Sequence, residues 1–126
     1  MDCLRRKNSF RSLTKRRDFQ LVFKEGVTFA SKYLVMYARP NELDFNRLGL
    51  SVSKKVGTAV TRNKIKRLLR ESMKRLLLEF PLNHDFIIIA RKSSVEGGLC
   101  DFIRDIKSFL TRLFYEKSSH ISNKAL

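Results

Sequence analysis

The segment Ser53–Leu78, SKKVGTAVTRNKIKRLLRESMKRLLL, combines a helical apolar stripe with a dense set of positive charges. It contains no Gly or Pro from Ala59 onward, and Gly57-Thr58 offers a loop and an N-cap, so the segment predicts a helix. At 100° per residue, its apolar side chains and one serine share a single face. We expect this face to pack against a core; its members are Ile65, Leu68, Leu69, Ser72, Met73 and Leu76.

The basic residues form a second face on the same predicted helix. Arg62, Lys66, Arg70 and Lys74 form a row at i, i+4 spacing, and Asn63 and Arg67 lie just beside this row. Most charged helix faces are simply solvated, but those faces usually intersperse acids, and Glu71 is the only acid in the segment. Arg62, Lys64 and Lys66 also lie near the helix N-terminus, where the helix dipole disfavours cations. The pattern therefore favours a face that binds a polyanion.

The composition of the whole chain agrees with a nucleic-acid partner. Its 126 residues fit one domain, and 27 basic against 12 acidic residues give a formal net charge of +15. The longest apolar run, Phe86–Ala90, is too short to span a bilayer, and no signal peptide is expected. Cys3 and Cys100 are too few for a disulfide framework, so we expect free thiols in a cytoplasmic protein.

Periodicity along the rest of the chain predicts the remaining elements. A helix runs from near Thr14 to Lys24 or Glu25, and a second, strongly apolar helix covers Leu99–Tyr115. Alternating strands at Val27–Arg39 and Arg47–Lys54 form a hairpin, and His84–Lys92 contains a strand covered on both faces. The order α-β-β-α-β-α predicts an α+β fold, a two-layer α/β sandwich with a small sheet backed by helices. The expected ordered core is about 10–116, with a mobile basic arm at 1–12 and a frayed polar tail at 117–126.

The two alternating strands predict one apolar face and one mixed face. The apolar face holds Ala30, Leu34, Met36, Ala38, Leu48, Leu50 and Val52. The other face holds Phe29, Tyr33, Val35, Tyr37, Arg39, Arg47, Gly49, Ser51 and Ser53. Aromatic rings beside cations suit unpaired nucleic acid, although an aromatic cluster covered by a helix fits the pattern equally well. The i, i+4 pair Phe19 and Phe23 most simply indicates core packing.

No catalytic constellation is evident in the sequence. Neither His84 nor His120 has a partner at metal-ligand spacing, and no Gly-rich phosphate loop is present. Ser51-Val-Ser-Lys54 matches an S-x-x-K pattern, but its companion motifs are missing. The acids are scattered, without a pair placed for general acid–base work. We therefore expect that any reaction involving this protein takes its chemistry from another molecule.

Four blocks of the sequence resemble the protein component of bacterial ribonuclease P. They occur in the family's order and extend the likeness over roughly Thr14 to Tyr115: Asp18-Phe19-Gln20-x-Val22-Phe23-Lys24-x-Gly26, Gly49–Lys55, Lys54-Lys55-x-Gly57-x-Ala59-Val60-x-Arg62-Asn63-x-x-Lys66-Arg67-x-x-Arg70-Glu71, and Ile87–Arg91. The resemblance implies a left-handed β-α-β crossover, against the usual rule. It also implies a catalytic RNA that uses Mg²⁺, held mainly by the RNA, to remove the 5′ leader from precursor tRNA. The protein would be an accessory subunit, monomeric outside the holoenzyme.

The resemblance also implies a role for individual residues. The expected RNA-subunit contacts are Arg62, Asn63, Lys64, Lys66, Arg67, Arg70 and Lys74. The expected leader contacts, in a cleft between the first helix and the sheet, are Phe19, Phe23, Tyr37, Ser51, Lys55 and Arg91. Asn63 is a weak candidate metal ligand, since one amide oxygen cannot make a site alone. The family's R-N-R motif reads Arg62-Asn63-Lys64 here, which keeps the charge but puts a bidentate contact in doubt.

Two other functions stay open from the sequence. A generic RNA-binding or ribosome-associated protein could carry the same basic helix without any preference for a leader. A nuclease acting through its own side chains is disfavoured by the scattered acids, and membrane-surface binding is disfavoured because the helix's apolar stripe is expected in the core.

Overall fold

The computed structural model describes residues 9–125, with side chains up to 115, as one five-stranded mixed sheet covered by helices. This confirms the predicted α+β sandwich. The helices are α2 (Arg16–Glu25), α3 (Ala59–Arg75) and α4 (Leu99–Ala125), with 3₁₀ turns at Leu77–Glu79 and Lys92–Glu96. The strands are β1 (Phe10–Ser12), β2 (Val27–Ala30), β3 (Leu34–Pro40), β4 (Asn46–Ser51) and β5 (His84–Ala90). Their order across the sheet is β1-β4-β5-β3-β2.

Strand β5 lies in the middle of the sheet, which corrects the predicted hairpin. It pairs antiparallel with β3 and parallel with β4, so β3 and β4 are not neighbours. The run Phe86–Ile89 has no polar side, and such a strand needs cover on both faces. The parallel pair β4 and β5 is connected through α3, as the resemblance implies; the left-handed sense of this crossover stays a prediction.

A turn at Ser31 divides the predicted strand Val27–Arg39 into an antiparallel pair, β2 and β3. The Ser31 hydroxyl and backbone both bond Leu34, with the backbone N–H donating to the Leu34 carbonyl at 2.8 Å. The reversal places Phe29 opposite Met36, on the core face, rather than beside Tyr37 as predicted. Tyr33 is buried too, and Ala30 is exposed. A single alternating strand was therefore the wrong interpretation of this segment.

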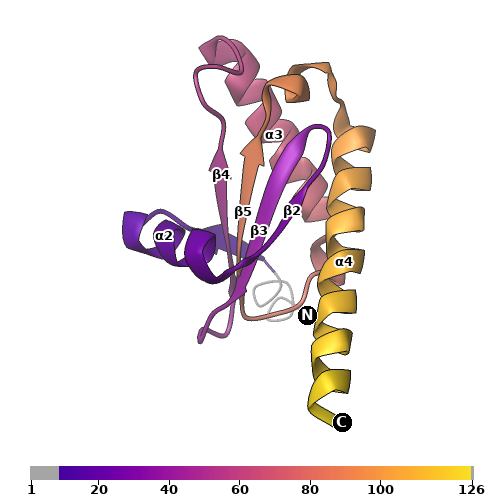
Figure 1. The fold of residues 1–126 in the computed structure, drawn as a ribbon. Coiled ribbons are helices and arrows are strands. Elements are labelled where there is room, and N and C mark those ends of the chain that lie inside the picture. Colours follow the sequence, from indigo (N-terminus) through magenta and orange to yellow (C-terminus); the bar gives the residue numbers. More distant parts are fainter. Residues whose placement is uncertain (1–8, 126) are drawn as a thin grey trace.

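Helices cover both faces of the sheet: α2 lies on one side, and α3 and α4 lie on the other (Figure 1). The larger core lies under α3 and α4, and buries Met36, Ile88 and Phe86 from the sheet. On α3 it buries the predicted stripe, with Leu68 partly exposed, and the Ser72 hydroxyl donates to the Leu68 carbonyl at 2.8 Å. The helix starts as predicted, because the Thr58 side chain accepts from the Thr61 N–H.

Both expected mobile ends contain regular structure within the residues that the structure describes. Phe10–Ser12, the last part of the predicted arm, form β1, which pairs parallel with β4 and places Phe10 beside Phe80 and Phe86. Residues 1–8 lie outside the described part. At the other end, α4 continues to Ala125, through most of the tail that was expected to fray. No helix in this description is both long and apolar enough to cross a membrane.

Candidate nucleic-acid interface

The face of the sheet under α2 is organised in three rows that run across β3, β5 and β4. The strand register defines them as Arg39–Asp85–Arg47, Tyr37–Ile87–Gly49 and Val35–Ile89–Ser51. Residues of α2 pack on the first two rows. The third row, which we call the floor, is only half-buried, although two of its three side chains are apolar. The floor is therefore an accessible, mainly apolar surface at one end of the sheet.

Three predicted leader contacts form an aromatic cluster beside the floor. Phe19 rests on Gly49, where an added Cβ would lie 2.5 Å from the Phe19 ring, so this approach requires glycine. Phe23 meets Tyr37 edge-on with ring centroids 4.9 Å apart, and the Phe19 and Phe23 centroids are 6.1 Å apart. Phe23 is 42% exposed. The pair is thus not plain core packing, because one ring faces solvent while the other is wedged against the sheet.

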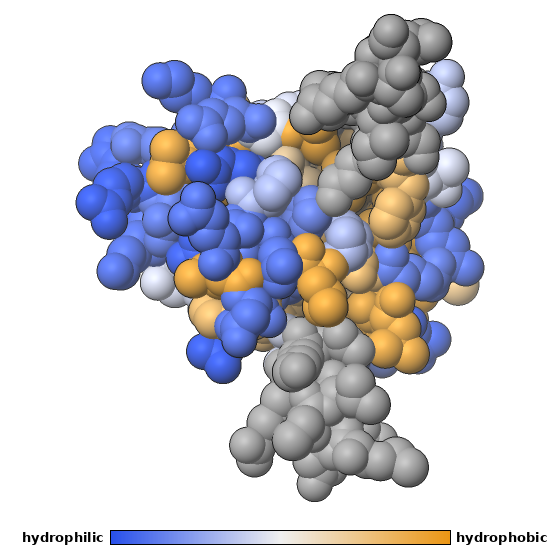
Figure 2. All heavy atoms as spheres, turned by 90° about the horizontal axis from the view of Figure 1, so that it is seen from below, coloured by the Kyte–Doolittle hydropathy of each residue, from blue (hydrophilic) through white to orange (hydrophobic). Residues whose placement is uncertain are grey.

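The other predicted leader contacts gather at the same end of the sheet. Ser51 belongs to the floor, opposite Ile89, and Lys55 is exposed in the turn that follows β4. Arg91 comes directly after β5 and is exposed, with its guanidinium donating to the Ser31 carbonyl at 2.9 Å. Helix α2 packs beside this surface on the same face of the sheet. Figure 2 views the molecule from the opposite end, where the surface on the side of α2 is largely hydrophilic. The exposed polar residues on and just before α2 are Thr14, Lys15, Arg16, Arg17, Gln20, Lys24 and Glu25, so basic side chains predominate there.

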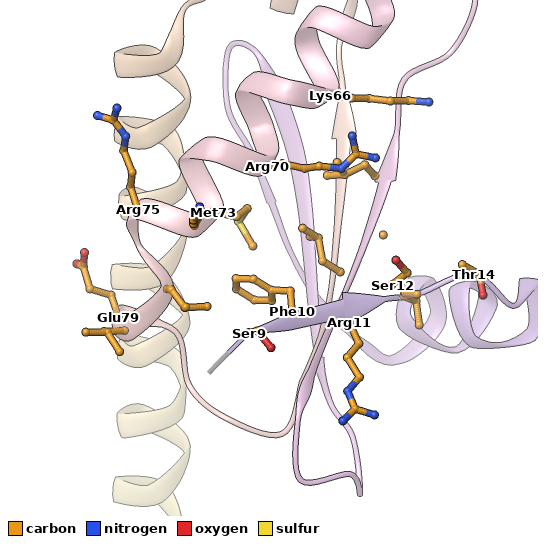
Figure 3. Close-up of a pocket in the computed structure, with 17 residues that line it drawn as sticks. Ser9, Phe10, Arg11, Ser12, Thr14, Lys66, Arg70, Met73, Arg75 and Glu79 are labelled. Atoms are coloured by element: carbon orange, nitrogen blue, oxygen red, sulfur yellow. The ribbon is translucent and has the colours of Figure 1, made fainter. Parts of the chain in front are cut away.

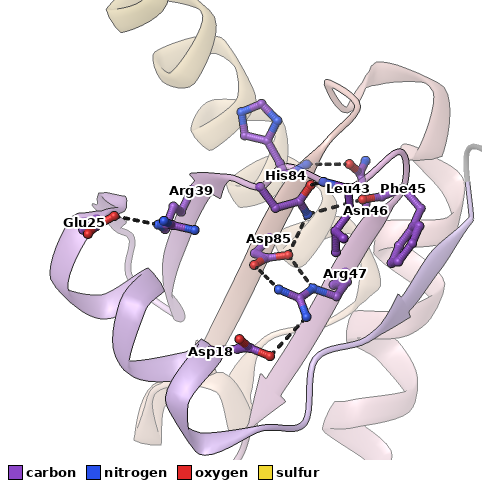
Figure 4. Close-up of polar contacts among 10 residues, drawn as sticks. Asp18, Glu25, Arg39, Leu43, Phe45, Asn46, Arg47, His84 and Asp85 are labelled. Carbon is purple, nitrogen blue, oxygen red and sulfur yellow. Dashed lines mark hydrogen bonds and ion pairs between the residues drawn. The ribbon is translucent and has the colours of Figure 1, made fainter.

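A buried ion-pair network holds α2 in this position (Figure 4). Arg47 donates to both oxygens of Asp85 at 2.8 and 2.7 Å, and to Asp18 of α2 at 3.1 Å. Asn41 donates to Asp85 as well, at 2.8 Å. Hydrogen bonding to Asp85 raises the pKa of Arg47 above its ordinary value, and the charge of Asp18 adds to this. Asp18 precedes Phe19, so the network fixes the helix next to the aromatic cluster.

Sequence reasoning did not single out this network. The sequence predicts Arg47 only as a member of the mixed face of the strands, and it shows no pairing among the acids, Asp18 and Asp85 included. One signal was available: Asp85 directly precedes the apolar run of a strand that is buried on both faces along most of its length, and a buried carboxylate needs a cationic partner. The partner itself could not be named from sequence, because it depends on the pairing of β4 with β5.

The predicted RNA-subunit contacts lie on α3, away from its buried stripe. Asn63, Lys64, Arg67, Arg70 and Lys74 are exposed, while Arg62 and Lys66 are half-buried. Within the described residues none of these basic side chains forms an ion pair, whereas the neighbouring Arg75 bonds Glu71 at 3.1 Å. Only the connection 52–58 separates Ser51 of the floor from the start of α3. The first turns of α3 therefore follow the floor closely in the sequence.

Asn63 lies among cations and does not form a metal site with its neighbours. Arg62 and Lys64 flank it, and the part of the chain that is described contains no cluster of three His, Cys, Asp or Glu residues that could hold a metal ion. Mg²⁺ prefers several oxygen ligands, with carboxylates or phosphates among them. The residues present do not fit a resident Mg²⁺ on the protein alone.

Comparison with known proteins identifies the family. Residues 8–114 match the family model for ribonuclease P. The ribonuclease P protein component of Clostridioides difficile is 42% identical over 107 residues, covering 83% of this chain and 93% of the relative; that of Alkaliphilus metalliredigens is 37% identical over 102 residues, covering 75% and 92%. Among solved structures, the Staphylococcus aureus RNase P protein superposes with a TM-score of 0.74 at 37% identity, covering 83% of this chain and 96% of that one. The Thermotoga maritima protein gives 0.72 at 36% identity, covering 81% and 96%. This chain therefore belongs to the family of bacterial ribonuclease P protein components.

Proposed function

We propose that this chain binds the catalytic RNA subunit of ribonuclease P and the 5′ leader of precursor tRNA, and thereby assists removal of the leader. Family membership already makes it a subunit of an endoribonuclease that processes tRNA. The observation that carries the finer proposal is the cluster of Phe19, Phe23 and Tyr37 beside a half-exposed floor. Such a surface has the properties of a platform for an unpaired strand, which a leader provides and a mature tRNA 5′ end does not.

The leader contacts follow from the chemistry of that surface. Exposed Phe23 offers a ring on which a base can stack, and the floor accepts apolar contact from a neighbouring nucleotide. Lys55 and Arg91, at the ends of β4 and β5, are positioned to neutralise phosphates. If two such contacts each contribute about 1–3 kcal/mol before the cost of ordering the leader, the preference for precursor over product reaches roughly tens- to thousands-fold.

The α3 cations would bind the RNA subunit. Like charges without carboxylate partners repel one another along a helix, and that cost is recovered when phosphates approach. The Arg62 Nε atom is buried without a hydrogen-bond partner in the described structure, a further cost that suits a side chain retained for binding. Under this proposal the RNA supplies the chemistry and holds Mg²⁺, and the protein offsets repulsion between two RNAs. We expect a cytoplasmic protein that is monomeric outside the holoenzyme.

The test is cleavage of a precursor tRNA at low Mg²⁺ by the cognate RNA subunit alone, the protein alone, and both together. The proposal predicts efficient cleavage only with both, and a gain in affinity that depends on the leader. Cleavage by the protein alone would contradict the proposal, because it would show that the protein and not the RNA supplies the chemistry. Equal affinity for precursor and leaderless tRNA would make the chain a generic RNA-binding protein instead.

A further inference from the structure

A groove of about 1200 Å³ opens between α3 and the β1–β4 edge of the sheet (Figure 3). It lies mainly on the face opposite α2 and reaches around the sheet edge to Leu13 and Gly49, the glycine that Phe19 covers on the α2 side. The floor residues do not line it. In the rows Ala38–Phe86–Leu48 and Met36–Ile88–Leu50, the side chains of β3 and β5 are fully buried, whereas those of β4 are only half-buried. The helices on this face therefore cover the centre of the sheet and leave the edge formed by β1 and β4 open.

The groove has an apolar base and a mainly cationic rim, to which Glu79 adds one acid. Phe10, Leu48, Leu50 and Met73 line its base. Lys66 and Arg70 extend from α3 over the strands, while Met73 points down towards Phe10 (Figure 3). Lys74 completes the rim one turn further along α3, and these three cations have no carboxylate partner among the described residues. The groove is at least as large as pockets that hold drug-sized ligands, which occupy roughly 300–1,000 Å³.

This combination discriminates between classes of ligand. A regular RNA duplex presents phosphates, which need only cations, and it has no apolar group that would fill the base of the groove. An unpaired nucleotide presents both a phosphate and a flat base that gains from contact with apolar side chains. An acidic peptide could satisfy the cations of the rim, but the chain's net charge of +15 and the RNA subunit that the proposed function requires favour a nucleotide.

We propose that this groove binds an unpaired nucleotide of the RNA subunit, with the base against Phe10, Leu48 and Leu50 and the flanking phosphates on Lys66, Arg70 and Lys74. The inference rests on the proposed function, since it requires that the RNA subunit binds this chain. It goes beyond it by adding β1 and the sheet edge to the interface, on the face that does not hold the leader.

The first test fills the groove without removing any side chain that would touch RNA. Ser12 is exposed, lies on β1 opposite Leu48 and lines the groove, so Ser12→Trp would occupy the space of a base. Ser108→Trp, at an exposed position on α4, is the matched control. We expect Ser12→Trp to weaken binding of the RNA subunit by roughly 5- to 100-fold, the range for losing one stacked base, while Ser108→Trp binds like the unchanged protein. Thermal unfolding of both variants checks that each is folded.

The second test locates the nucleotide. A photo-crosslinker on Ser12→Cys, in a chain with Cys3→Ser and Cys100→Ser, should react with an unpaired nucleotide of the RNA subunit. An RNA subunit with an abasic site at the crosslinked nucleotide should bind the unchanged protein more weakly than the intact RNA does. The same abasic site should not weaken binding to Ser12→Trp any further. Unchanged affinity of folded Ser12→Trp, or crosslinks confined to duplex RNA, would overturn the groove proposal alone. Failure of the unchanged protein to bind the RNA subunit would instead overturn the proposed function, and the groove proposal with it.

Discussion

Replacing Arg47 by methionine isolates the contribution of the buried network that holds α2 on the sheet. Asp85 has a side chain that is only 2% exposed, and Arg47 supplies two of its hydrogen bonds, at 2.8 and 2.7 Å. Methionine keeps much of the volume but leaves the carboxylate with Asn41 as its remaining side-chain donor. Removing one partner of a buried ion pair costs about 3–5 kcal/mol, and we expect the lower end because Asn41 remains. Urea unfolding followed by circular dichroism measures this loss.

The same chain provides a control for this prediction. Arg39 bonds Glu25 of α2 at 2.9 Å, but those side chains are 26% and 49% exposed. An ion pair at this exposure is worth at most about 1 kcal/mol, so Arg39→Met should change the free energy of unfolding little. The folded protein raises the pKa of Arg47, so the stability contributed by the charged guanidinium is fully present at any pH below the ordinary pKa of arginine. The difference in free energy of unfolding between the unchanged protein and Arg47→Met should therefore stay constant between roughly pH 7 and 10. If Arg47→Met costs no more than Arg39→Met, the view that this network anchors α2 is wrong.

Three further predictions concern the interface. Phe23→Ala should reduce the preference for precursor over leaderless tRNA by roughly 5- to 100-fold in binding measurements. It should also lower thermal stability modestly, because the ring is 42% exposed and the rest of it packs on Tyr37 and Phe19. Gly49→Ala should lower the free energy of unfolding by about 1–3 kcal/mol and weaken leader binding, because the new methyl group would meet the Phe19 ring. Recovery of stability on adding Phe19→Leu would support this cause. Full stability of the single variant would contradict it. Arg67→Gln should lower the magnitude of the slope of log affinity against log salt for the RNA subunit by roughly 0.7–0.9, the value for one lost phosphate contact. Arg75→Gln is the control and should lower that slope less, because Arg75 is already paired with Glu71. Equal slopes for the two variants would show that pairing with an acid does not matter here.

Local pattern was enough to predict the features that depend on a residue's own neighbours in the chain. The α3 stripe and its opposite cationic face follow from a period of 3.6 residues, and the buried positions Leu34, Met36 and Ala38 follow from a period of two. The motif blocks were enough to predict the family, which the comparisons confirm. Residue type and spacing carry this information because helices and single strands are stabilised by one buried face each.

The tertiary structure alone decided which strands meet and what the mixed face becomes. Alternation shows that a strand has two faces, but it does not identify the neighbouring strand, and this is why β5 between β3 and β4 was missed. The turn at Ser31 moved Phe29 to the core side, and three residues of an expected arm became β1. The contact of Phe19 with Gly49 and the pairing of Arg47 with Asp85 depend on the same strand order. Contacts between residues far apart in the chain are set by the packing of whole elements, and no local period encodes that packing.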